Sequence, residues 1–156
     1  MKPNIGLTEK SLSGSIKILT KVLADQVTLY TKTRKFHWNV SGDSFMELHK
    51  LFQAQYTELE EVIDEVAERI NKLGGKTIGT LKEFSALTSI KESSTYPSQK
   101  EMIKELLGDH EMLIMQLRDD IDTCAETHKD AGTADFLTGL MEQHETIAWI
   151  LRRYLN

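Results

Sequence analysis

The sequence contains one cysteine, two prolines and no long uninterrupted apolar run. A single cysteine, Cys124, excludes an internal disulfide framework and suits a reducing compartment. No stretch approaches the roughly 20 apolar residues that a membrane-spanning helix needs. The start of the chain, Met1 to Gly6, lacks the apolar core of a secretory signal. These absences predict a soluble, cytoplasmic protein that does not associate with membranes.

Clusters of positive charge are also scarce. The formal net charge is −5, and near the N-terminus Lys2 and Lys10 are offset by Glu9. Sequence-independent binding to DNA needs several basic side chains that contact phosphates together. We therefore predict no appreciable DNA binding at physiological salt, whereas the negative balance suits cations.

No segment shows the alternation typical of a β-strand, whereas four long segments repeat apolar residues every three or four positions. These segments cover approximately residues 9–39, 44–73, 98–127 and 133–156. Three pairs have the spacing of a capping box and predict helix starts. They are Ser44 with Glu47, Thr80 with Glu83, and Ser98 with Glu101.

The connections between these segments are short, long and short. Residues 40–43 and 128–132 make the short turns, and the long middle connection contains a short helix over about residues 80–87. This order predicts an all-α, up-down-down-up four-helix bundle with one long crossover. We expect one domain over residues 9–156, preceded by a short tail over residues 1–8.

Bundles with this connectivity often hold two metal ions internally through Glu-x-x-His pairs on two of the helices. The chain has five histidines, and none has a glutamate three residues earlier. The pattern for an internal di-iron site is therefore absent, and a metal would have to bind elsewhere. His110, His128 and His144 are expected to be packing or surface residues, and Cys124 a small apolar residue.

The remaining histidines, His37 and His49, combine with Asp64 and Glu68 into a donor set that suits iron or manganese. Asp64 and Glu68 are one helical turn apart and can converge on one cation. His49 and Asp64 are fifteen residues apart on one helix, which separates them by roughly 22 Å. One chain cannot bring them together, whereas an antiparallel second copy can, across a two-fold interface. The alternative is that the carboxylates form an ordinary solvated acidic face.

The surrounding residues resemble the Dps family, ferritin-like proteins first named as DNA-binding proteins from starved cells. The resemblance covers essentially the whole chain. It rests on His37-Trp38-Asn39-Val40-Ser41-Gly42, Phe45, Leu48-His49, Asp64, Ala67-Glu68-Arg69 and Leu73-Gly74-Gly75. It implies a ferritin-like bundle assembled as a hollow homododecamer, with ferroxidase centres at the two-fold interfaces.

The resemblance also implies the chemistry. His37 and His49 match the family's ligands from one subunit, and Asp64 and Glu68 match those from its partner. The metal would be iron: Fe(II) would be oxidised by hydrogen peroxide or dioxygen and stored as ferric oxyhydroxide. Trp38 matches an aromatic residue beside the centre, which either quenches radicals or packs.

One position departs from the family pattern. Many members carry an aspartate four residues after the second histidine, where this chain has Gln53. The missing negative charge weakens the expectation of a second iron in each centre, although Glu47 lies near enough in sequence to compensate.

The sequence leaves alternatives for two assignments, the role of three acidic residues and the function of the protein. Glu126, Asp130 and Asp135 match the region of the family's acidic entry pore, but they also fit ordinary electrostatics at a helix end. The main functional alternative to iron storage is a DNA-compacting structural protein with secondary metal binding. A helical interaction module without metal is the third possibility.

Overall fold

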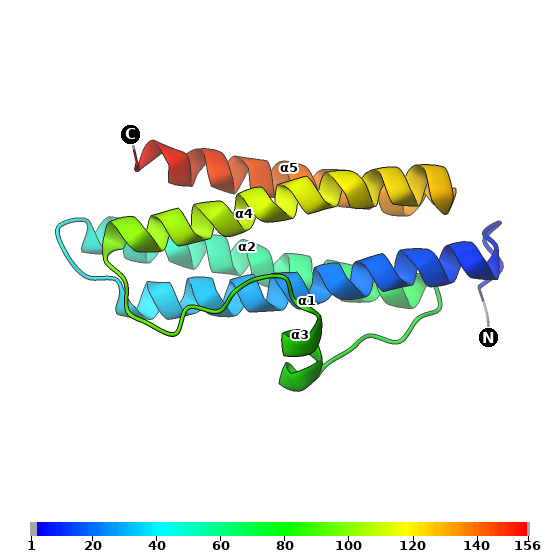
Figure 1. The fold of residues 1–156 in the computed structure, drawn as a ribbon, viewed down its shortest axis with the longest axis horizontal. Helices are drawn as coiled ribbons and strands as arrows, with labels where there is room; N and C mark the ends of the chain where they lie inside the picture. Colours follow the sequence, from blue (N-terminus) through cyan, green and yellow to red (C-terminus); the bar gives the residue numbers. More distant parts are fainter. Residues whose placement is uncertain (1–2, 156) are drawn as a thin grey trace.

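The computed structural model describes residues 3–155, and this part of the chain is helical (Figure 1). Its elements are α1 (Glu9–Asn39), α2 (Phe45–Lys72), α3 (Leu81–Leu87), α4 (Gln99–Asp122), the π-helical turn η1 (Thr123–Thr127) and α5 (Ala131–Arg153). The prediction of an all-α bundle with a short helix in the crossover is confirmed. Lys2, one of the two N-terminal lysines on which the prediction about DNA binding rests, lies outside the described residues.

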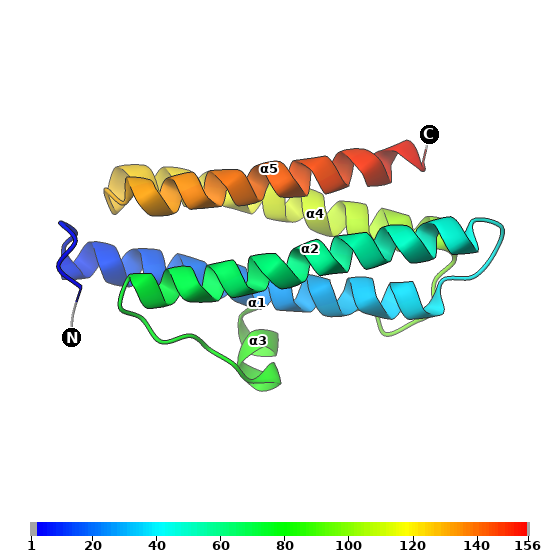
Figure 2. The same ribbon diagram turned by 180° about the vertical axis from the view of Figure 1, so that it is seen from behind.

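The four long helices form two layers. In one layer α1 packs against α2, and in the other α4 packs against α5 (Figures 1 and 2). The crossover leaves the end of α2, passes through α3 and runs along α1 to the opposite end of the bundle, where α4 begins. This path makes α2 and α4 parallel, as the up-down-down-up prediction requires.

Capping side chains set most helix starts. Thr80 and Ser98 form the predicted capping boxes with Glu83 and Glu101. The capping box predicted at Ser44 is wrong, because the Ser44 side chain makes no cap hydrogen bond. Its φ of −99° and ψ of 25° depart from the extended conformation typical of an N-cap.

The turn into α5 also differs from the prediction. The helix begins at Ala131 rather than near Thr133, because the Asp130 side chain accepts a hydrogen bond from the Thr133 backbone N–H and caps the helix. Before this turn, α4 gives way to the π-helical turn that carries the buried Cys124. Burial raises the pKa of the Cys124 thiol to about 11, so this residue is an unreactive packing group, in line with its expected apolar role.

The core consists of two apolar clusters placed end to end along the bundle. One gathers around Leu19, Val66 and Leu137, and the other around Phe36, Phe52 and Leu106. Four buried polar side chains, one from each long helix, lie near the middle of the bundle: Gln26, Gln55, His110 and His144. We call these four side chains the polar layer; apolar side chains of the two clusters lie on either side of it.

The crossover is held on α1 by polar contacts at successive helical turns. The fully buried Asp25 carboxylate accepts hydrogen bonds from the Thr88 hydroxyl and the Ser89 backbone N–H. Further along α1, Lys32 donates to the Lys91 carbonyl oxygen at 3.0 Å. These bonds add to the apolar contacts of Ile90, which is buried in the core, whereas α3 contributes no buried residue.

We expect the substitution Asp25→Ala to lower the free energy of unfolding by about 1.5–3 kcal/mol, the usual contribution of hydrogen bonds to a charged group. Chemical unfolding would measure the change. The matched control is Glu92→Ala, at an exposed crossover position, which should change stability by less than about 0.5 kcal/mol. Equal stability of both variants would show that the crossover does not depend on Asp25.

In residues 3–155, no helix combines the length and apolar character that crossing a bilayer requires.

Candidate metal centre

A tight turn brings the two candidate histidine ligands together. α1 ends at Asn39 and α2 begins at Phe45, and the intervening Gly42 has a φ of +119°, which side-chain-bearing residues rarely adopt. His37 in the last turn of α1 therefore faces His49 in the second turn of α2. The expectation that both histidines share one corner of the bundle is met.

The two imidazoles are stacked and hold each other through the backbone. Their ring centroids are 3.8 Å apart with an interplanar angle of 19°. The Nδ1–H of His37 donates to the carbonyl oxygen of His49 at 2.7 Å. The Nδ1–H of His49 donates to the carbonyl oxygen of His37 at 2.9 Å.

This reciprocal pair suits metal binding. A histidine that ligates a metal usually donates its other ring N–H to a carbonyl or carboxylate, which fixes the tautomer and orients the ring. With both Nδ1 atoms donating, each Nε2 carries a lone pair. His37 is buried and His49 half-buried, so the turn holds both rings in place before any ion arrives.

An aromatic cluster adjoins the histidines. The Tyr56 ring meets His37 edge-on, with centroids 5.2 Å apart, and meets Tyr30 at 6.0 Å. The guanidinium carbon of Arg34 lies 4.9 Å from the Tyr56 ring centre, 5.4 Å from Tyr30 and 5.2 Å from Trp38. Trp38 was expected beside the centre from the sequence, whereas Tyr30, Arg34 and Tyr56 were not.

The candidate carboxylates lie farther along α2. Asp64 and Glu68 are exposed, and Glu68 forms an ion pair with Lys72 at 3.2 Å. Within residues 3–155 no group of three or more His, Cys, Asp or Glu side chains could hold a metal ion. The structure therefore brings His37 and His49 together but does not bring Asp64 and Glu68 to them within one chain.

The positions considered for a second iron also have defined surroundings. Gln53 is exposed on α2, one turn beyond His49. Glu47, instead of capping its own helix, accepts a hydrogen bond from the Tyr154 hydroxyl at 2.9 Å. Partial burial, together with this bond and the Glu47 charge, raises the Tyr154 pKa. Glu47 thus ties the C-terminal turn to the start of α2.

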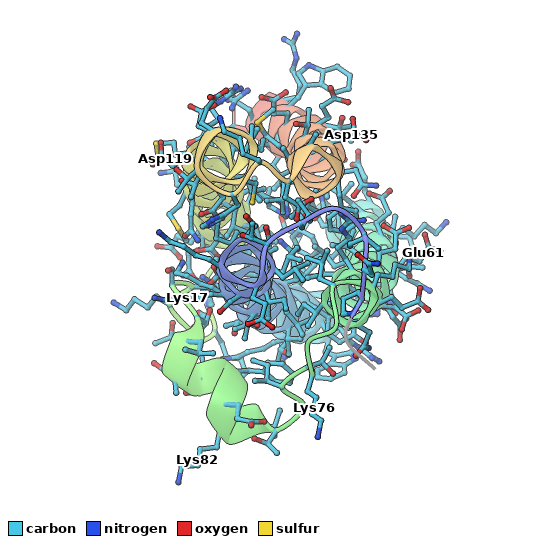
Figure 3. All side chains as sticks on the ribbon, turned by 90° about the vertical axis from the view of Figure 1, so that its right-hand side faces the viewer. Lys17, Glu61, Lys76, Lys82, Asp119 and Asp135 are labelled. Carbon is cyan, nitrogen blue, oxygen red and sulfur yellow. The ribbon has the colours of Figure 1, made fainter. Side chains whose placement is uncertain are left out.

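The three candidate pore residues do not share one environment. Glu126 and Asp135 are exposed, and Asp135 points away from the bundle (Figure 3). Asp130 is buried, accepts from Thr133 and forms an ion pair with Arg69. Although burial opposes it, the Thr133 hydrogen bonds keep the Asp130 pKa below its usual value. Asp130 is a helix cap, and Asp135 lies beyond the first turn of α5 rather than at its start.

Two other histidines lie at the centre of the bundle. His110 and His144 are buried, and their Nδ1 atoms are 2.8 Å apart. Their assignment to packing is correct, but the hydrogen bond between them was not predicted. It joins two positions on separate helices, and only the packing of α4 on α5 reveals it.

Comparison with known proteins places this geometry in a class. The ferritin-like domain family matches residues 16–156. The chain is 47% identical over 154 residues to an uncharacterized low temperature-induced protein of Nostoc sp. strain PCC 7120, covering 98% of this chain and 86% of that protein. The fold and the matched length define a ferritin-like protein.

Similarity to individual proteins identifies a family within the ferritin-like class. The chain is 38% identical to DNA protection during starvation protein 2 of Bacillus anthracis, covering 90% of this chain and 96% of the relative. A Dps protein from Vibrio cholerae O1 superposes with a TM-score of 0.93 at 29% identity, covering 99% of this chain and 97% of that one. The chain belongs to the Dps family of ferritin-like proteins.

Proposed function

We propose that the protein oxidises and stores iron in a self-assembled shell, as a ferroxidase that removes Fe(II) and hydrogen peroxide together. The observation that carries the proposal is the His37–His49 pair, whose Nε2 atoms are left available by two reciprocal backbone hydrogen bonds. The structure of the Vibrio cholerae relative is described as that of a ferritin-like diiron-carboxylate protein. Iron is the substrate of this reaction and the cargo of the shell.

The centre we propose lies between two copies of the chain. His37 and His49 of one subunit would bind Fe(II) together with Asp64 and Glu68 of its two-fold partner. Imidazole nitrogens and carboxylate oxygens suit Fe(II) and leave positions open for the oxidant. The exposed apolar side chains of Trp38, with 64% of its surface exposed, and Met46, with 56%, adjoin the histidines and would be covered in such a contact.

The proposed reaction consumes two Fe(II) for each hydrogen peroxide. Each iron gives one electron, the oxygen–oxygen bond breaks, and two protons complete two water molecules, so hydroxyl radical is not released. Fe(III) then hydrolyses to ferric oxyhydroxide inside a dodecameric shell. Glu126 and Asp135, both exposed, remain candidates for attracting cations toward a pore, whereas Asp130 is buried as a helix cap.

Protection of DNA, which the name of the Bacillus anthracis relative describes, would follow here from removing Fe(II) and peroxide rather than from contact with DNA. The net charge of −5 disfavours binding to phosphates. The expectation that the protein acts in the cytoplasm stays part of the proposal.

The proposal is tested by following Fe(II) oxidation by hydrogen peroxide on assembled protein. We expect His37→Ala and Asp64→Ala each to slow oxidation by at least about tenfold, because loss of one ligand removes a direct bond to the ion. The matched control is His128→Ala, a histidine outside the centre. Equal rates in all four proteins would reduce the four residues to an interface without ferroxidase activity.

A further inference from the structure

Arg34 carries a positive charge that its own chain leaves unbalanced. Within residues 3–155 it forms no ion pair, and its one hydrogen bond joins Nη1 to the Tyr30 hydroxyl oxygen. Its Nε is buried without a hydrogen-bond partner. The rings of Tyr30, Trp38 and Tyr56 surround the guanidinium and hold it on the α1–α2 face. A guanidinium fixed in this way is suited to bind a carboxylate that comes from outside the chain.

Glu60 is a carboxylate on the same face that also has no partner. It lies eleven residues after His49 and four before Asp64, close to whole numbers of helical turns, so these three side chains share one side of α2. Glu60 is exposed and forms no ion pair in the part of the chain that the structure describes. After the larger effect of the Tyr30 hydrogen bond, its charge helps to raise the Arg34 pKa, so Glu60 lies near Arg34 without an ion pair to it.

The two-fold symmetry of the proposed centre determines which part of α2 meets the partner's Glu60. The partner's carboxylate ligands would come level with His49, so the axis crosses α2 midway between the histidine and the carboxylates. Rotation about this axis places the partner's Glu60 level with about residues 53–57. Tyr56 lies in this range, and the Arg34 guanidinium carbon is 4.9 Å from its ring centre. The symmetry that would complete the centre therefore also brings the partner's Glu60 to Arg34.

Two acidic helices face each other across such an axis. Six of the residues 58–68 on α2 are aspartate or glutamate, and an antiparallel pair places the two runs side by side. Iron would balance the carboxylates that bind it, but the two copies of Glu60 near the axis would repel each other. Arg34 places a cation at this point of the surface, and one copy from each subunit balances both glutamates.

We propose that Arg34 of each subunit forms an ion pair with the partner's Glu60, and that the two equivalent pairs select the antiparallel alignment that completes both centres. This inference rests on the proposed function, because the two-fold arrangement comes from it. A guanidinium and a carboxylate can form two parallel hydrogen bonds, which fix the alignment of the subunits as well as balancing charge. A partner shifted by one helical turn would lose both ion pairs together.

The test uses charge reversal in the iron-free protein, with assembly followed by native mass spectrometry at low ionic strength. Arg34→Glu and Glu60→Arg each place like charges at both contacts, so we expect each variant alone to form two-fold pairs at least about tenfold more weakly. The double variant Arg34→Glu/Glu60→Arg restores both ion pairs with the charges exchanged, and it should assemble as the wild type does. Circular dichroism checks that every variant keeps its helices.

Mixing the two single variants tests the pairing without reference to the wild type. In a pair of one Arg34→Glu chain and one Glu60→Arg chain, both contacts join opposite charges, whereas either pair of identical chains joins like charges. Mixed pairs should therefore exceed the half expected from random assembly, and added salt should reduce the excess. The matched control is Glu61→Arg, whose glutamate points away from the bundle (Figure 3) and which should not select the Arg34→Glu chain.

The ion pair and the ferroxidase function can fail separately. Random mixing, or a double variant that assembles as weakly as the single ones, would overturn the ion pair, while Fe(II) oxidation by the wild type would leave the function standing. Selective mixing in a protein that does not oxidise Fe(II) would support the ion pair and overturn the function. A wild-type protein that stays monomeric at micromolar concentration would overturn both.

Discussion

Between pH 6.5 and pH 4 the protein is expected to lose stability steeply because of the buried His110–His144 pair. Burial lowers the pKa of His144 from 6.5 to about 4, and burial and the neighbouring imidazole lower that of His110 well below 6.5. No carboxylate contributes to either shift. Both rings are therefore neutral in the folded chain at neutral pH.

The hydrogen bonds explain why this pair resists protonation. The Gln26 amide nitrogen lies 2.9 Å from His144 Nε2 and donates to it, so His144 carries its proton on Nδ1 and donates to His110 Nδ1. The remaining nitrogen, His110 Nε2, is buried without a partner. A proton added to either ring would place an uncompensated charge in the polar layer between two apolar clusters.

The sign of the effect follows from linkage. Below pH 6.5 the unfolded chain binds protons at these histidines and the folded chain does not, so stability falls as pH falls. A shift from 6.5 to about 4 at His144 corresponds to about 3 kcal/mol lost by pH 4, or roughly 6–12 °C in Tm for a chain of this size. His110 adds to this loss in the same direction.

Thermal unfolding of the iron-free protein as a function of pH would measure the effect. The double substitution His110→Leu/His144→Leu removes both titrating groups, so its Tm should fall much less between pH 6.5 and 4, whatever its value at pH 7. His128→Leu is the matched control and should keep the wild-type pH dependence. Parallel curves for all three proteins would show that the buried pair does not govern acid stability.

The features of the fold that could be predicted from the sequence are those that depend on residues close together in the chain. The apolar periodicity predicts all four long helices, and the capping boxes at Thr80 and Ser98 predict two helix starts correctly. The box at Ser44 does not form: the Ser44 side chain makes no cap hydrogen bond, and Glu47 bonds to Tyr154, which is 107 positions away in the chain. The residues around Ser44 give no sign of this contact between Glu47 and a residue so distant in the chain.

In the candidate metal centre too, some features could be predicted from local sequence and others depend on how the helices pack. The turn chemistry around Gly42 places His37 and His49 at one corner, but their reciprocal hydrogen bonds depend on the register of α1 against α2. Tyr30, Arg34 and Trp38 recur at four-residue intervals on α1, so their shared face was visible in the sequence. That Tyr56 completes this cluster depends on the packing of the two helices.

The central claim is that each centre combines histidines from one subunit with carboxylates from its partner, and subunit mixing tests it most directly. One variant carries His37→Ala and His49→Ala, and the other carries Asp64→Ala and Glu68→Ala. Each alone should assemble and oxidise Fe(II) poorly, because both of its two-fold related centres lack ligands.

Refolding the two variants together in equal amounts makes half of the two-fold pairs mixed if assembly is random. Each mixed pair contains one centre with all four ligands intact and one with none. The mixture should therefore recover about one quarter of the wild-type centres, and a similar share of the Fe(II) oxidation rate, from two inactive proteins. No recovery in a shell shown to contain both variants would contradict an intersubunit centre.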